Sequence, residues 1–101
     1  MPKLYEYFGL VFLFWTHEHE PMHLHVQYGS SESIVELIVQ GGKLTTLNWR
    51  SKRGKRALGA QERAEAERFV RNKFADIERK WFAYFVERKH ITPERITRRI
   101  K

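Results

Sequence analysis

Five segments within residues 3–49 have the short length and the β-branched or aromatic content that are typical of strands. Glycine-containing turns separate several of them, and adjacent glycines at Gly41-Gly42 permit the positive φ angles of a tight hairpin. Short connections between short strands predict an antiparallel meander of about five strands. The expected strands are Lys3–Phe8, Val11–Thr16, His23–Tyr28, Ser33–Val39 and Leu44–Trp49.

The pattern changes to helical spacing from about residue 60 to residue 89. Apolar residues recur there at intervals of three and four and form one stripe, which predicts a long amphipathic helix. The stripe contains Ala66, Val70, Phe74, Ile77, Trp81 and Phe85, with Phe69 at its edge. Trp81, Phe82, Tyr84, Phe85 and Ile91 are therefore expected in the core.

Thr92-Pro93-Glu94 has the residue types of a helix start, which predicts a short terminal helix over about residues 93–100. The sheet has one apolar face to bury and the long helix has one apolar stripe. Packing the helix on the sheet buries both, so we expect a single α+β domain over residues 1–101.

The second expected strand is apolar on both faces. A further element would then have to cover one of these two faces, which carry either Phe12 and Phe14 or Val11, Leu13 and Trp15. The terminal helix could be that element, and so could a second copy of the chain, so a homodimer is one of the expectations.

The composition excludes several classes of site. The 101 residues include no cysteine, which excludes disulfides and thiolate metal centres. No segment has the apolar length needed to cross a bilayer or the pattern of a signal peptide. We therefore expect a cytoplasmic protein with no membrane partner.

Charge is divided unevenly between the two halves of the chain. Residues 1–49 have two Lys and no Arg against five Glu, a net −3, while residues 50–101 have seventeen Lys/Arg against seven acids, a net +10. Such asymmetry points to a polyanion or an acidic protein as partner of the second half, and a basic protein without such a partner is the alternative.

The densest positive charge is in residues 50–56, hereafter the cationic segment, where five of seven residues are Lys or Arg. Flexible cations around Gly54 could follow phosphate groups. Trp49 beside them could stack on a base, although its place at the end of an amphipathic strand favours the core. The expected binding residues are Arg50, Lys52, Arg53, Lys55 and Arg56, and Arg95, Arg98, Arg99 and Lys101 form a second basic cluster.

A histidine cluster lies between residues 16 and 28. In an extended strand His23 and His25 share one face, while Leu24 and Val26 share the other. Three readings remain open. With His19 the pair could bind a divalent metal such as zinc; His23 and His25 with Glu18 could act as acid–base catalysts; or the histidines could be structural.

Acid–base catalysis by two histidines beside a basic surface would suit RNA cleavage, with Arg or Lys stabilising the phosphorane. The serines show no nucleophile signature such as G-x-S-x-G. The sequence therefore does not favour an enzyme over a binding protein.

The segment Glu18-His19-Glu20-Pro21-Met22-His23-Leu24-His25-Val26 resembles the E-H-x-P-x-H-x-H-V signature of a bacterial family, domain-of-unknown-function family 4160. Met1-Pro2, Gly9 before an apolar run, and Trp81 also match; Met22 stands where many members have a second proline. The resemblance implies no activity. It implies membership of small two-gene modules of toxin–antitoxin type, as is often suspected for the family.

The sequence thus predicts a small binding module whose basic second half docks on nucleic acid or an acidic partner protein. The alternative is a metal-binding or hydrolytic, ribonuclease-like protein built on His19, His23 and His25.

Overall fold

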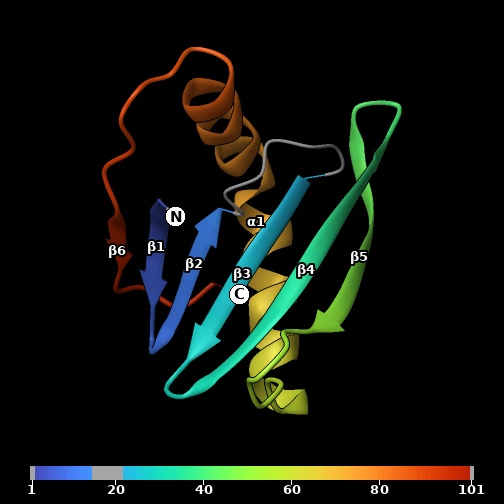
Figure 1. The fold of residues 1–101 in the computed structure, drawn as a ribbon. Helices are drawn as coiled ribbons and strands as arrows, with labels where there is room; N and C mark the ends of the chain where they lie inside the picture. The colour runs from blue at the N-terminus through green and yellow to red at the C-terminus, as the bar shows by residue number, and fades with distance from the viewer. Residues whose placement is uncertain (1, 15–21, 101) are drawn as a thin grey trace.

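The computed structural model describes residues 2–14 and 22–100. They form one six-stranded sheet with one long helix against it, so the protein is of the α+β class. Figure 1 shows α1 lying behind the sheet, along its strands. The strands are β1 (Lys3–Tyr7), β2 (Leu10–Phe14), β3 (Met22–Tyr28), β4 (Ser31–Gln40), β5 (Lys43–Ser51) and β6 (Glu94–Ile96), and the helix is α1 (Ala60–Phe85).

The first five strands form the antiparallel meander that the sequence predicts, in the spatial order β5-β4-β3-β2-β1, and β6 lies beside β1 at the edge of the sheet. β4 and β5 extend beyond the expected strands at both ends: Gln40 pairs with Lys43 beside the tight turn at Gly41-Gly42, and Ser33 pairs with Ser51 at the far end. A second tight turn, Gly29-Ser30, joins β3 to β4, and Gly29 has the positive φ of 58° that a two-residue hairpin requires.

The core fills the space between α1 and the sheet. Phe69 lies at its centre: its ring stacks on Phe12 with a centroid distance of 4.7 Å and also contacts Tyr5 and Tyr7. The expected stripe is confirmed at Ala66, Val70 and Ile77, which are fully buried. Phe69 is therefore a central residue and not an edge residue of the stripe.

The sequence-based expectation for Phe82 is wrong, because its side chain is 50% exposed. Trp81, Tyr84, Phe85 and Ile91 are partly buried and pack against the core. α1 ends at Phe85, four residues earlier than expected. Arg88, with φ of 58°, turns the chain out of helical geometry just after it.

The predicted terminal helix over residues 93–100 is also wrong. This part of the chain runs along the edge of the sheet, where β6 pairs in parallel with β1. An unpaired edge of β1 would leave backbone donors and acceptors without partners, and pairing with β6 satisfies them. The backbone N–H of Ile100 also donates to the Tyr7 hydroxyl at 2.9 Å.

β6 does not cover the second face of β2. Phe12 and Phe14 point into the core and are fully buried, while Val11 and Leu13 lie on the opposite face and are half-buried. Trp15 lies outside the described residues.

Candidate functional site

The sheet has a second face, opposite α1, which we call the outer face. β3 is extended over Met22–Tyr28, and its apolar residues Leu24 and Val26 are buried in the core. His23 and His25 alternate with them and therefore share the outer face, as predicted. In register with His25 across the sheet lie Ile34 of β4 and Arg50 of β5, so the histidines and the start of the cationic segment occupy the same face.

His25 and Glu32 form a buried pair on this face. Their side chains are 1% and 5% exposed, and His25 Nδ1 lies 2.5 Å from Glu32 Oε2. Burial lowers the pKa of His25, against the raising effect of Glu32, so the imidazole is neutral at pH 7. The pKa of Glu32 is also lowered: burial opposes ionisation, but hydrogen bonds from His25 and Gln27 outweigh it. Since an ionised carboxylate only accepts, Nδ1–H of His25 donates to Glu32.

The same carboxylate holds two further side chains. Gln27 Nε2 donates to Glu32 Oε1 at 3.2 Å. Lys52, from the cationic segment, places its Nζ 4.0 Å from Glu32 Oε2. The histidine cluster and the cationic segment are thus joined through one buried glutamate.

Backbone contacts fix the cationic segment to the start of β4. The N–H of Glu32 donates to the carbonyl of Arg56 at 2.8 Å, and the N–H of Leu58 donates to Ser33 Oγ at 3.0 Å. Just before these anchors the N–H of Lys55 donates to the carbonyl of Lys52 at 3.1 Å, closing a turn. Gly54 has φ of 79° at its third position, which is the requirement of a type II turn.

Most cations of this segment are not neutralised by the protein itself. Arg50, Arg53, Lys55 and Arg56 are exposed, and within residues 2–14 and 22–100 no carboxylate lies within 4.0 Å of their charged nitrogens. An anchored backbone with outward, unpaired cations is suited to binding an anion with several charges.

Trp49 does not provide a stacking platform beside these cations. Its Nε1 donates to Glu67 of α1 at 2.5 Å, and its ring packs against the core. Trp49 is thus partly buried against the core, on the side that the sequence favours.

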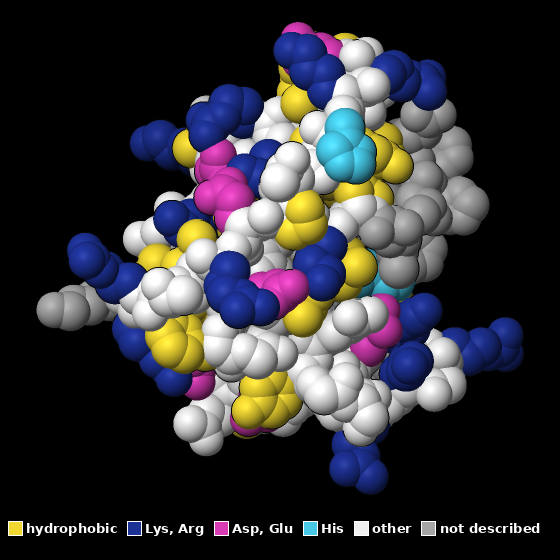
Figure 2. Space-filling model, turned by 90° about the vertical axis from the view of Figure 1, so that its left-hand side faces the viewer, with side chains coloured by type: hydrophobic (Ala, Val, Ile, Leu, Met, Phe, Trp, Pro, Cys, Tyr) yellow, Lys and Arg dark blue, Asp and Glu magenta, His cyan; other side chains and the backbone are white. Residues whose placement is uncertain are grey.

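Two arginines of the second basic cluster are paired with carboxylates, while Arg98 is exposed without a described carboxylate partner. Arg95 pairs with Glu6 at 3.3 Å and Arg99 pairs with Glu65 at 2.7 Å, while the Arg99 guanidinium lies 4.0 Å from the ring centroid of Phe8. Figure 2 views the molecule from the β6 side and shows Asp and Glu side chains set between the Lys and Arg side chains there. Lys101 lies outside the described residues.

The structure brings together only part of the predicted metal and catalytic set. His23 is half-buried on the outer face, opposite Glu36 in register. His19 and Glu18 lie outside the described residues. Among the residues that are described, no group of three or more His, Asp or Glu side chains has the geometry to hold a metal ion.

Sequence reasoning missed Glu32, which falls in the connection between the expected strands His23–Tyr28 and Ser33–Val39. The hairpin turn is only Gly29-Ser30, so β4 begins at Ser31 and Glu32 stands opposite Gln27. A two-residue loop beginning with glycine was the available signal, since that loop length fixes this register.

Comparison with known proteins adds a family and no activity. Residues 9–82 match the family described as Domain of unknown function (DUF4160). No curated protein and no solved structure matches the chain. Among the described residues, no helix is both long enough and apolar enough to cross a membrane. The match covers more than half of the chain and agrees with the motif resemblance, so the protein belongs to the DUF4160 family.

Proposed function

We propose that the protein is a binding module that holds the phosphate backbone of a nucleic acid through its cationic segment. The observation that carries the proposal is the contrast between a fixed backbone and free charges. The segment is held to β4 at its two ends, where β5 pairs with β4 as far as Ser51 and where Arg56 and Leu58 bond to β4, while Arg50, Arg53, Lys55 and Arg56 point to solvent without a described carboxylate partner.

The composition of the segment favours phosphate over an acidic protein surface. Protein interfaces depend on buried aromatic or aliphatic anchors. Residues 50–56 contain only Arg, Lys, Ser and Gly, and the nearby ring of Trp49 is committed to the core. A surface of cations without an apolar anchor matches the chemistry of phosphate contacts, which position the partner without reading its sequence.

The cationic segment contains no aromatic residue, and this limits the kind of nucleic acid that it can prefer. Proteins that hold single strands combine cations with aromatic rings on which bases stack. The cationic segment has no such ring, so it would contact backbone alone, with little sequence preference and with at least equal affinity for a duplex.

The burial of His25 favours binding over hydrolysis. A general acid or base must come within hydrogen-bond distance of the proton it transfers. The side chain of His25 is 1% exposed and its Nδ1 is occupied by Glu32, so its position suits support of the cationic segment.

Titration of a fluorescent 20-base-pair duplex, followed by anisotropy, tests the proposal. Replacing Arg53, Lys55 and Arg56 by Ala should weaken binding about 100-fold near 0.1 M salt, because three phosphate contacts are lost. The matched control replaces Arg95, Arg98 and Arg99 by Ala, which removes the same charge. Because Arg95 and Arg99 are already paired with carboxylates, the control should bind much more tightly than the first variant.

Equal losses in the two triple variants would show that net charge alone governs binding, and would contradict the proposal. Tighter binding to an acidic peptide such as oligo-glutamate than to the duplex would contradict it as well, in favour of an acidic protein partner. Degradation of the RNA form of the duplex, lost on His23→Gln, would favour the hydrolytic alternative.

A further inference from the structure

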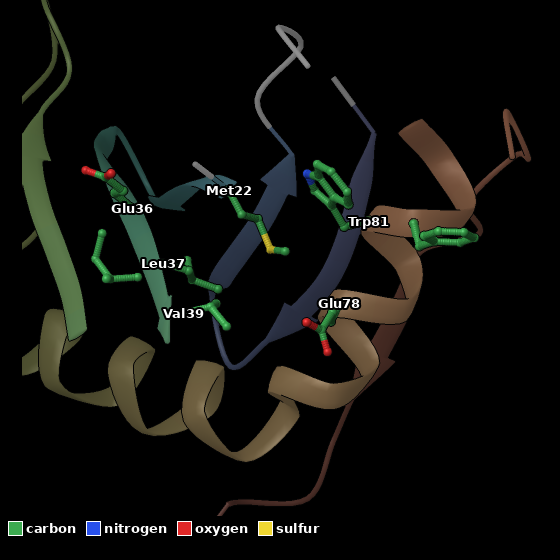
Figure 3. A pocket seen from close by; sticks show the side chains of 8 residues that line it. Met22, Glu36, Leu37, Val39, Glu78 and Trp81 are labelled. Carbon is green, nitrogen blue, oxygen red and sulfur yellow. The ribbon is translucent and has the colours of Figure 1, made fainter. Parts of the chain in front are cut away.

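A groove lies near the C-terminal end of α1, the end farther from the cationic segment. Its floor is apolar, and it is negatively charged. It has a volume of about 480 Å³, and Met22, Leu37, Val39, Glu78, Trp81 and Phe82 line it. Figure 3 shows that Met22, Leu37 and Val39 from the sheet face Glu78 and Trp81 from α1 across the open space. A space of this size accommodates a few side chains of a ligand.

The groove leaves apolar side chains in contact with solvent. Phe82 is 50% exposed and Val39 is 37% exposed, and Val86, one helical turn after Phe82, is 53% exposed. Phe8, by contrast, is exposed elsewhere but lies against the guanidinium of Arg99. Exposed apolar residues gathered around a concave surface are typical of an interaction site.

The charge at the groove is opposite to that of the whole protein. The net charge of the chain is +7, yet among the described residues the only charged ones that line the groove are Glu36 and Glu78. Glu78 points into the space, while Glu36 points away from it on the other side of β4 (Figure 3). No Lys or Arg among the described residues lies within 4.0 Å of either carboxylate.

The charge of the groove argues against two other kinds of occupant. A nucleic acid or an anionic lipid would be repelled by Glu78. A second copy of the chain, packed groove to groove across a two-fold axis, would bring two Glu78 carboxylates into one interface with no described Lys or Arg of the lining to pair with them. The complementary occupant is cationic with apolar side chains to fill the floor.

We propose that the groove between α1 and β4 docks a short segment of a partner protein in which apolar side chains alternate with Lys or Arg. The apolar side chains enter against Met22, Leu37 and Phe82, and a cation pairs with Glu78. This surface is separate from the cationic segment and does not depend on the proposed function.

The test uses the full-length protein and two hexapeptides, Lys-Leu-Phe-Lys-Leu-Lys and Glu-Leu-Phe-Glu-Leu-Glu, titrated by calorimetry. The basic peptide should bind and the acidic one should not. Glu78→Lys should weaken binding of the basic peptide by about tenfold or more through charge reversal, and Phe82→Ala should weaken it by removing an exposed apolar contact. Because both side chains are exposed, neither variant should unfold the protein, which circular dichroism checks.

Glu62→Lys is the matched control, since it makes the same charge change in the first turn of α1, far from the groove, and should leave peptide binding unchanged. The variant with Arg53, Lys55 and Arg56 replaced should also bind the basic peptide normally, which separates this proposal from the previous one. Absence of binding, equal binding of both peptides, or equal loss in Glu78→Lys and Glu62→Lys would overturn the proposal. A wild-type dimer that Phe82→Ala dissociates would also overturn it, since the groove would then be a contact between two copies.

Discussion

The two basic clusters of this protein have similar composition and opposite surroundings. In the C-terminal stretch, Arg95 and Arg99 pair with Glu6 and Glu65, and β6 completes the edge of the sheet beside β1. In the cationic segment, only Lys52 approaches a described carboxylate, Glu32, and the other four cations project outward. Net charge therefore does not identify an interaction surface by itself; the partner of each cation within the fold does.

The largest expected effect concerns the buried pair that supports the cationic segment. His25→Ala removes the donor to Glu32 and leaves a buried carboxylate with fewer hydrogen bonds, so the free energy of unfolding should fall by about 3 kcal/mol. His23→Ala, on the same face but half-buried, should cost less than about 1 kcal/mol. Urea unfolding of both variants measures the difference, and equal losses would show that His25 has no special structural role.

Most of the fold was predictable because its strands and its helix follow from patterns among residues that are close in the sequence. The alternation in β3 and the three- and four-residue spacing in α1 each depend on neighbouring residues. β6 was not predictable in this way: Thr92-Pro93-Glu94 has the local chemistry of a helix start, but the open edge of β1, far away in sequence, determines its conformation. Parallel pairing of that kind has no signature within the segment itself.

The sequence identifies the residues of the candidate site but not the contacts between them. The cationic segment is visible in the sequence as five charges in seven positions. Which of these charges are neutralised depends on Glu32, whose place follows from the register of a hairpin. Burial of His25 likewise depends on tertiary packing, so sequence alone left its three roles open.

Acid should weaken the buried pair of His25 and Glu32. The pKa of His25 is lowered in the folded state, chiefly by burial, so the unfolded chain binds the proton more readily. The stabilisation is then complete above the unfolded pKa of about 6.5 and is lost as the pH falls below it. Unfolding free energies at pH 7.5 and pH 5.5 should show this loss, and His25→Gln should reduce it. Between these pH values Glu32 and Asp76, whose pKa values are also lowered, stay ionised in the folded protein.

An unchanged pH dependence in His25→Gln would assign the acid sensitivity to other groups, and the neutral, buried state of His25 would then be contradicted.

The smallest expected effect is at the second basic cluster, at an arginine that is paired with a carboxylate. Arg99→Ala removes an exposed ion pair with Glu65 and a cation–π contact with Phe8, so it should lower stability by about 0.5–1 kcal/mol. Duplex affinity should change by less than about threefold, since a paired arginine releases few counterions when nucleic acid binds. Arg53→Ala is the matched comparison: it should leave stability unchanged and reduce duplex affinity more. The reverse ranking for affinity would assign the interface to the C-terminal stretch.

The salt dependence of duplex binding tests the central claim most directly. Four outward cations should give a slope of about −3.6 in a plot of log K against log salt concentration. Removal of Arg53, Lys55 and Arg56 should reduce that slope to about −0.9, while removal of Arg95, Arg98 and Arg99 should change it by about 0.9 at most, because only Arg98 of these three has no described carboxylate partner. A slope near zero in the wild-type protein, or an equal reduction in both variants, would contradict the account.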